Sequence, residues 1–295
     1  VEDGSKETSE TIVEDFKDRL EIKYFYKQNT GPGDSRNVGA GKCSGDYLVF
    51  FDSDCVIPED YFEKVNSFLL KTWLDVYGGP DKAPSETGYL QKAINYSMTS
   101  LLTTGGIRGH KSQAKKFEPR SFNMGVSRQI FVESGGFCDI HPGEDPELIY
   151  RLMAKGVTKG LIPEAFVYHK RRINFIQFAK QVYKFGIART ILMKWHPGSR
   201  KFIFMLPSMA CILGIIMLIL GLTNSVFWQI IFMGMAIVVL DAVISTRNFF
   251  VAFLGLAATT IQVFSYGLGF LNGWWNLFIL NKQEQSSFPF MFRGV

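Results

Sequence analysis

Two aspartates stand two residues apart, directly after an apolar run. Asp52-Ser53-Asp54 follows Tyr47–Phe51. Carboxylates at positions i and i+2 where a buried strand ends can leave the sheet together and offer hard oxygen ligands to Mg²⁺ or Mn²⁺ on a diphosphate. A turn or a helix cap explains the same pair more plainly. The flanking segments, Gly45-Asp46 and Cys55–Pro58, favour the chemical interpretation.

A second acidic pair, Glu144-Asp145, precedes Pro146 and a predicted helix over 147–155. A carboxylate at a helix N-terminus is kept ionised by the helix dipole and the unpaired amides. That environment suits a general base, which must accept a proton from a hydroxyl within hydrogen-bond reach. A simple N-cap satisfies the pattern equally well. We predict Asp145 as the base, with Glu144 beside it.

Strands and helices alternate around these acids. Alternation at 22–26 predicts a strand, 36–44 a short helix, and Tyr47–Phe51 a buried parallel strand. Pro58 opens a helix whose inward residues are predicted to be Phe62, Val65, Phe68 and Leu69. This order predicts an α/β sheet with helices on both faces, and such sheets bind ligands at the carboxyl ends of their strands.

Taken together and in order, these motifs resemble the family 2 glycosyltransferases, whose nucleotide-binding domain has the GT-A fold. The resemblance covers residues 1–170, and its motifs are Val1–Ser5, Ser35–Gly39 with Gly45–Tyr47, Asp52–Asp54, and Gly143–Asp145 followed by Glu147 and Arg151. It implies a Rossmann-like mixed sheet that binds a nucleotide sugar, with a preference for a UDP-sugar, together with Mg²⁺ or Mn²⁺.

The resemblance also implies roles for single residues. Asp3 would contact the uracil or ribose, Asp52 the ribose, and Asp54 with Asp52 the metal and diphosphate. Arg36 would contact the donor, and Asp145 would be the base. His169 matches the place where some GT-A enzymes have a metal-ligating histidine, although a structural histidine is the commoner case. Further candidate contacts to the diphosphate are Lys170, Arg171 and Arg172.

Processive members of the family carry a QxxRW motif after the base. Here Gln181-Val182-Tyr183-Lys184-Phe185 has Lys for Arg and Phe for Trp. Cation and aromatic character remain, so Gln181 and Lys184 are candidate acceptor or membrane-proximal residues. The departure favours transfer of a single sugar over polymer synthesis.

Charge separates the chain into two parts. Residues 202–281 contain only two charged side chains, Asp241 and Arg247. A stretch of this length cannot be an ordinary soluble surface, which excludes a wholly soluble enzyme and predicts an all-α transmembrane region. We predict a GT-A domain over 1–172, an amphipathic interfacial helix region over 173–201 broken near Gly186, and a tail over 282–295. The predicted spans are 203–222, 226–245 and 249–280, the last as one tilted helix or as a span plus an interfacial piece.

The basic cluster over 170–201 precedes the first span and predicts a multi-pass protein of the cell membrane with a cytoplasmic catalytic domain. Three spans would leave the tail on the opposite face. Asp241 and Arg247 would mark the turn between the second and third spans. The four cysteines lack metal-ligand spacing, and a reducing compartment is expected. The chain opens inside a strand and turn, so an N-terminal strand is expected to be missing.

We therefore expect a membrane-anchored, metal-dependent, inverting glycosyltransferase that moves a sugar from a nucleotide sugar to a lipid-linked or saccharide acceptor at the membrane. A nucleic-acid partner is not expected. The alternatives are a processive polysaccharide synthase and a membrane-anchored nucleotide-binding subunit without turnover. A nucleotidyltransferase would explain the aspartate pair but not Glu144-Asp145.

Overall fold

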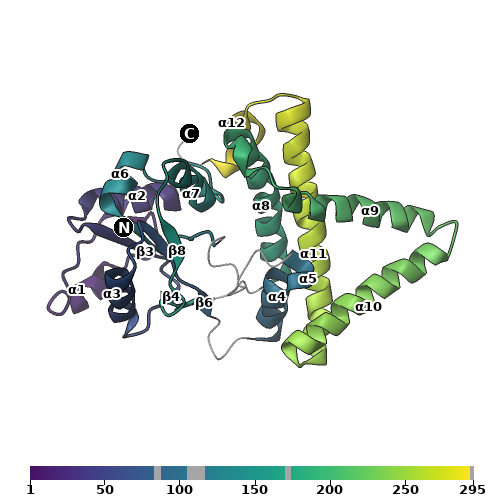
Figure 1. Ribbon diagram of the computed structural model, residues 1–295, viewed down its shortest axis with the longest axis horizontal. Coiled ribbons are helices and arrows are strands. Elements are labelled where there is room, and N and C mark those ends of the chain that lie inside the picture. The colour runs from purple at the N-terminus through teal and green to yellow at the C-terminus, as the bar shows by residue number, and fades with distance from the viewer. Residues whose placement is uncertain (83–87, 105–116, 170–173, 293–295) are drawn as a thin grey trace.

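The structure, a computed structural model, describes residues 1–82, 88–104, 117–169 and 174–292. An α/β domain holds all the named strands, and a helical region follows it (Figure 1). The expected architecture, an α/β domain with mixed strand pairing followed by a helical region, is confirmed. Helix α8 (Phe175–Trp195) and helix α11 (Phe249–Trp274) lie side by side between the domain and the two remaining long helices (Figure 1).

Within the described residues, the strands form three small sheets with parallel and antiparallel pairing, in keeping with the expected mixed sheet. The central sheet has the order β3-β7-β5-β8, in which β7 runs antiparallel to β3 and β5, and β8 runs parallel to β5. Strand β9 pairs with β4 and β6, and β1 pairs with β2. The strands are β1 (Glu2–Asp3), β2 (Tyr26–Lys27), β3 (Tyr47–Phe51), β4 (Cys55–Val56), β5 (Val76–Gly78), β6 (Asp81–Lys82), β7 (Asn123–Ser127), β8 (Lys159–Leu161) and β9 (Val167–His169).

In the part of the chain that the structure describes, seven helices lie between these strands in sequence. They are α1 (Glu10–Phe16), α2 (Pro32–Lys42), α3 (Tyr61–Lys71), α4 (Tyr89–Thr99), α5 (Leu101–Thr104), α6 (Arg128–Ser134) and α7 (Glu144–Ala154). Helix α2 begins at Pro32, four residues before the predicted start, because a proline fits the first turn of a helix. The strand predicted over 22–26 is only the two residues of β2.

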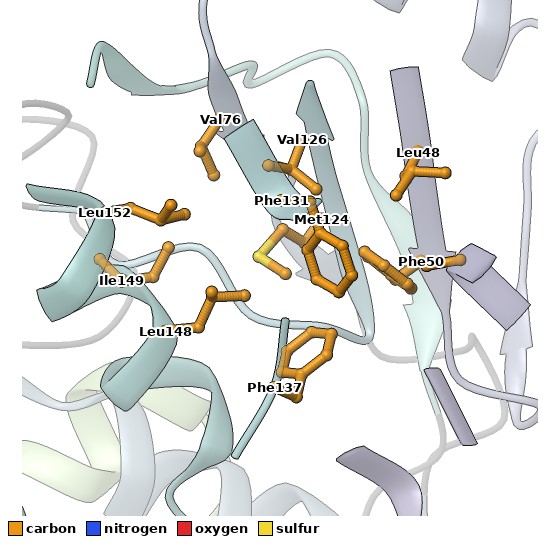
Figure 2. Packing of buried hydrophobic residues seen from close by; sticks show 11 residues of the cluster. Leu48, Phe50, Val76, Met124, Val126, Phe131, Phe137, Leu148, Ile149 and Leu152 are labelled. Atoms are coloured by element: carbon orange, nitrogen blue, oxygen red, sulfur yellow. The ribbon is translucent and has the colours of Figure 1, made fainter. Parts of the chain in front are cut away.

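Strand β3 is apolar throughout because both of its faces are covered. Leu48 and Phe50 enter a core with α6, α7 and the strands β5 and β7 (Figure 2). Tyr47, Val49 and Phe51 pack against the second core, around Tyr61 and Tyr77. A continuous apolar run predicts such two-sided burial. The parallel pairing predicted for this strand is wrong, because its partner in the sheet is the antiparallel β7.

The inward face predicted for helix α3 is partly wrong. Phe62 on α3 is 57% exposed, whereas its neighbour Tyr61 is fully buried and donates a hydrogen bond to Asn123. The predicted inward residue Val65 is buried, and Phe68 and Leu69 are partly buried. The inward stripe therefore begins one residue earlier, because Tyr61 can bury its ring and still satisfy its hydroxyl.

Helix α8 is continuous through Gly186, so the predicted break is wrong. Gly186 allows close contact with α11: a Cβ atom there would lie 2.4 Å from the carbonyl oxygen of Tyr266. Gly269 on α11 makes the reciprocal contact, because a Cβ atom at that position would lie 2.1 Å from the carbonyl oxygen of Tyr183. Glycines at both positions let the two backbones meet, as at other close helix crossings.

The apolar block forms three helices, α9 (Leu206–Leu220), α10 (Val226–Thr246) and α11, which continues through a π-helical turn to Ile279. Among the described residues, Val226–Thr246 and Phe249–Ile279 are long and apolar enough to cross a membrane. The 15 residues of α9 are about 22 Å long, shorter than the predicted span over 203–222. The stretch from Phe249 to Ile279 is one continuous helix that ends in a π-helical turn.

The segment after α11 turns back onto the domain. Helix α12 (Glu284–Ser287) leads to Met291, whose carbonyl oxygen accepts a hydrogen bond of 2.7 Å from the amide of His141. Phe288, Met291 and Phe292 are buried against α8 and Ile140. The tail therefore packs beside the loop that leads into α7.

We predict that Gly186→Ala lowers the free energy of unfolding by about 1–3 kcal/mol, the usual cost of forcing a methyl group into a closed contact. Gly41→Ala on α2 is the matched control, since a Cβ atom there meets nothing within 4 Å. That substitution should be neutral or stabilising, because alanine favours a helix over glycine. Denaturant or thermal unfolding in detergent measures both. Equal effects of the two substitutions would contradict close packing at Gly186.

Candidate active site

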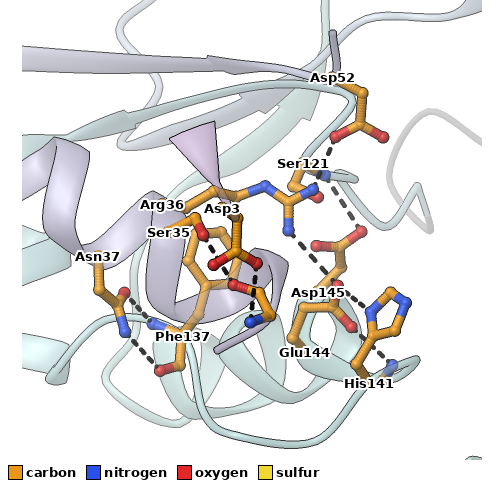
Figure 3. A network of polar contacts seen from close by, with 12 residues as sticks. Asp3, Ser35, Arg36, Asn37, Asp52, Ser121, Phe137, His141, Glu144 and Asp145 are labelled. Carbon is orange, nitrogen blue, oxygen red and sulfur yellow. Dashed lines mark hydrogen bonds and ion pairs between the residues drawn. The ribbon is translucent and has the colours of Figure 1, made fainter. Parts of the chain in front are cut away.

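The side chain of Arg36 joins two acidic segments that lie far apart in the sequence. One Nη atom donates to Asp52 Oδ1 at 2.7 Å, and the other lies 3.4 Å from Glu144 Oε1 (Figure 3). Only 14% of the Arg36 side chain is exposed, and its guanidinium stacks over Phe137. Helix α2 therefore ties the end of β3 to the start of α7 through one planar cation.

Glu144 has three polar contacts. Besides Arg36, it contacts Nδ1 of His141 at 2.9 Å and accepts from the amide of Gly143 at 2.9 Å. Burial alone would raise the pKa of Glu144, but the hydrogen bond and charge of His141, with Arg36, hold that pKa below its ordinary value. Glu144 is thus a buried negative charge fixed at the helix start.

Asp145 lies in a different environment, one residue further on. Its Oδ2 accepts from the amide of Ser121 at 3.2 Å, and its buried Oδ1 has no hydrogen-bond partner among the described residues. Burial and the neighbouring charge of Glu144 raise the pKa of Asp145 to about 6, although Arg36, Ser121 and Arg120 act in the opposite direction. Two adjacent carboxyls with pKa values pushed apart are a common sign of divided roles in an active site.

The predicted effect of the helix terminus on the pKa of Asp145 is wrong. From the sequence, we expected the helix terminus to favour the ionised form of Asp145. Instead, Glu144 takes the Gly143 amide and the His141 contact, and its charge acts against ionisation of Asp145. Helix α7 also begins at Glu144 rather than at 147. Asp145 is therefore a weaker acid than an ordinary aspartate, and one of its oxygens has no hydrogen-bond partner among the described residues.

Asp3, at the end of β1, is held by Lys27 on β2 and by the turn that follows β2. Its Oδ1 accepts from Lys27 at 2.5 Å and from the amide of Thr30, and its Oδ2 accepts from the amide of Gly31. Burial would raise the pKa of Asp3, but Lys27 and the two amides hold it below the ordinary value. Figure 3 draws Asp3 close to Ser35 and Arg36. A small cavity of about 20 Å³, room for one water, lies between residues 30–34 and 138–141.

The predicted metal ligands stand at the end of β3. Asp54 is exposed, and Asp52 is paired with Arg36. His169 is aligned with Cys55 in the ladder between β9 and β4, which brings its backbone to the residue after Asp54. Its side chain, like Lys170, Arg171 and Arg172, lies outside the described residues. Within the described part, no three His, Cys, Asp or Glu side chains cluster as a metal site would require.

Two carboxylates with hard oxygens still suit Mg²⁺ or Mn²⁺, if phosphate oxygens and water complete the coordination sphere. The donor set at Asp52 and Asp54 therefore fits the expected metal only together with a bound diphosphate.

Gln181 and Lys184 lie on α8, next to an open pocket of about 330 Å³. The pocket is mainly apolar, and the residues that line it are Ala179, Lys180, Tyr183, Lys184, Ser265 and Phe290. The same helix reaches the acidic site, because Ala188, one turn after Lys184, contacts the position of Gly143. The structure thus places Lys184 near the start of α7, whereas Gln181 lies one turn further away.

The sequence did not point to two histidines that hold α7. His141 contacts Glu144, and His196 at the end of α8 contacts Glu147 Oε1 at 3.2 Å. Arg151 pairs with Glu147 and donates to the carbonyl oxygen of Gly136. The position of His141, three residues before Glu144, could have predicted their contact from the sequence. The contact from His196 spans 49 residues and had no local signal.

The sequence profile of glycosyl transferase family 2 matches residues 1–135. An uncharacterized glycosyltransferase of Haemophilus influenzae is 38% identical over 76 residues, which are 25% of this chain and 30% of that protein. The minor teichoic acid biosynthesis protein GgaB of Bacillus subtilis is 27% identical over 182 residues, 58% of this chain and 19% of that protein. The chain therefore spans less than a third of the length of either relative.

The fold also has a solved counterpart. The mannosyltransferase PcManGT from Pyrobaculum calidifontis, in complex with GDP-Man and Mn²⁺, superposes with a TM-score of 0.59 at 11% identity, over 88% of this chain and 76% of that chain. At this identity the likeness concerns the fold alone. Sequence match and fold agree with the resemblance drawn from the motifs. Residues 1–135 therefore match the family 2 glycosyltransferases in sequence, and the chain has the GT-A fold.

Proposed function

We propose that the chain is a glycosyltransferase that moves one sugar from a nucleoside diphosphate sugar to an acceptor hydroxyl at a membrane surface, with inversion at the anomeric carbon. The observation that carries the proposal is the carboxyl of Asp145. It has an unsatisfied buried oxygen and a pKa raised to about 6, next to a glutamate whose pKa is lowered. A general base works best when its pKa lies near the working pH.

In the proposed reaction, Asp145 accepts the proton of the acceptor hydroxyl as that oxygen attacks the anomeric carbon. The bond from the anomeric carbon to the diphosphate breaks on the opposite side, and the nucleoside diphosphate leaves with the bonding electrons. Attack from the face opposite to the leaving group inverts the configuration. Glu144 contributes indirectly, because its fixed charge keeps Asp145 basic enough to take the proton.

The donor would lie between the end of β3 and the start of α2. Asp54 and Asp52 would hold Mg²⁺ or Mn²⁺, which when bound neutralises charge on the leaving diphosphate. Asp3, beside the turn at Gly31, is proposed to contact the nucleoside. The metal in the PcManGT complex supports a divalent ion, and the GDP-Man there leaves the base of the nucleotide open. A UDP donor remains our prediction from the family resemblance.

The acceptor is proposed to be lipid-linked or a saccharide held at the membrane. The pocket beside Lys180 and Lys184 offers an apolar wall of Tyr183 and Phe290 with two cations, which suits an anionic group on an apolar chain. Ala188, one turn further along α8 than Lys184, contacts the position of Gly143 before α7. The likeness to GgaB makes teichoic acid or another cell-wall glycan a reasonable class of product.

We predict that Asp145→Asn lowers kcat by about 10²–10⁴-fold, because the amide cannot accept the proton. Release of nucleoside diphosphate from a panel of nucleotide sugars measures the rate, and calorimetry with Mn²⁺ should show unchanged donor binding. Asp54→Asn should instead weaken donor binding and raise the metal requirement. Asp60→Asn, at an exposed acid before α3, is the control and should keep full activity. Full turnover by Asp145→Asn would exclude Asp145 as the base.

On the acidic side of the pH profile, kcat/KM should follow the ionisation of Asp145. Because only the ionised carboxylate accepts a proton, kcat/KM should rise with pH through a midpoint of about 6 and then level off. Glu144→Gln removes a charge that raises this pKa, so the midpoint should move to lower pH. An unchanged or higher midpoint in that variant would show that Glu144 does not tune the base.

Arg36→Met should have the opposite effect on the same limb. Arg36 lowers the pKa of Asp145, so its removal should move the midpoint above 6. The variant should also lose roughly 3 kcal/mol of stability, since the buried Glu144 and the partly exposed Asp52 lose their shared cation. Arg36→Lys should restore the charge but not both contacts, because an ammonium lacks the planar fork. A downward shift in Arg36→Met would contradict the proposed electrostatic balance.

A further inference from the structure

The apolar block is fastened to the α/β domain or to α8 at three separate places. The first is its beginning. The guanidinium of Arg200 donates to the carbonyl oxygen of Met193, near the end of α8. Phe204 is buried, and the guanidinium of Arg189 lies 3.8 Å from the centre of its ring. The chain therefore leaves for α9 from the side of the catalytic domain.

The second place is the end of α10. Asp241, the acid within the apolar block, accepts hydrogen bonds of 2.7 Å from the hydroxyls of Tyr96 and Ser100. Tyr96 and Ser100 lie on and directly after α4, which the chain inserts between β6 and β7 of the catalytic domain. Helix α4 packs against α8, where Ile94 and Phe178 share one buried cluster, so the chain has returned to the side of α8 before α11 begins.

The third place is the far end of α11. Lys194 on α8 donates to the carbonyl oxygen of Lys282, and Trp195 donates to Glu284 at 3.0 Å. The tail then packs against Ile140 and His141 of the domain. Between these ends, α11 runs against α8 from Ala258 beside Phe178 to Gly273 beside Thr190.

A segment whose two ends lie on one side of a bilayer crosses it an even number of times. We propose that α9 and α10 enter the lipid bilayer together as a hairpin and return to the catalytic side, whereas α11 lies along that side and does not cross. The catalytic domain and the tail then share one face of the membrane. This replaces the three spans expected from the sequence.

The surface of the hairpin has the chemistry that lipid requires. In Figure 1, α9 and α10 form a V that points away from the domain, with α11 across its open end. Residues exposed on the hairpin are large and apolar, including Leu213, Ile219, Phe232, Met233 and Leu240. At about 22 Å and 31 Å, the two helices are long enough to enter the hydrocarbon layer deeply.

The charges around the hairpin favour lipid over a second copy of the chain as the occupant. Arg200 and Lys201 precede the first leg in the chain, and Arg247 directly follows the second leg. Cations at this level would meet anionic headgroups, each contributing to membrane binding. By contrast, α11 cannot face lipid on all sides, because α8 beside it carries Lys180, Lys184 and Arg189.

The topology is tested by cell-free synthesis of the full chain with sealed vesicles of phosphatidylcholine and phosphatidylglycerol, so that the catalytic domain stays outside. The wild type carries exposed Cys43 as the outside reference, and Cys43→Ser with Ser286→Cys places the thiol in the tail. Burial raises the pKa of Cys55 to about 11, which keeps that thiol unreactive. An impermeant maleimide should label both proteins to the same extent before detergent is added.

Protection of Ser286→Cys until detergent opens the vesicles would overturn the proposal, because α11 would then cross the bilayer. The lipid contact has its own test by vesicle flotation. Phe232→Asp and Ile219→Asp should each reduce the bound fraction about 50-fold, from the cost of an acid in hydrocarbon. Leu70→Asp, at an 80% exposed position on α3, is the control and should bind as the wild type does. Equal binding by all variants, or a wild type that stays off vesicles as a dimer, would overturn it.

Discussion

The buried guanidinium of Arg36 is the contact on which the site depends. It bonds Asp52 at the end of β3 and Glu144 at the start of α7, which are separated by 92 residues in the chain. Without this cation, three acids would face one another in a poorly hydrated space, and burial of unpaired charge costs several kcal/mol. Arg36 therefore sets both the position of α7 and the balance of charge that Asp145 experiences.

Helix α7 is fixed from the other side by a second set of contacts. Glu147 and Arg151 join it to the loop at 134–136, and His196 links it to α8. The tail packs against the same loop that carries His141. The acid pair is thus attached to the helices that contact the hairpin. These contacts would hold the carboxyl of Asp145 at a fixed distance from the proposed membrane surface.

The sequence predicted the parts whose signals are local. The run Tyr47–Phe51 indicated a strand buried on both faces, and Asp52, Asp54 and Asp145 were assigned from motifs a few residues long. Contacts that join distant segments left no such signal. Nothing local showed that Arg36 would reach Glu144 or that Glu144 would take the helix amide from Asp145, so the direction of its pKa shift was predicted wrongly. Apolar length alone likewise could not distinguish a helix packed on α8 from one that crosses lipid.

The central claim is that Asp145 has been made a stronger base by burial and by Glu144. Infrared difference spectroscopy against Asp145→Asn can follow the protonated carboxyl of this one residue as the pH is varied. The account predicts that its carbonyl band disappears with a midpoint of about 6. A midpoint at or below 3.8, the ordinary value for an aspartate, would contradict it.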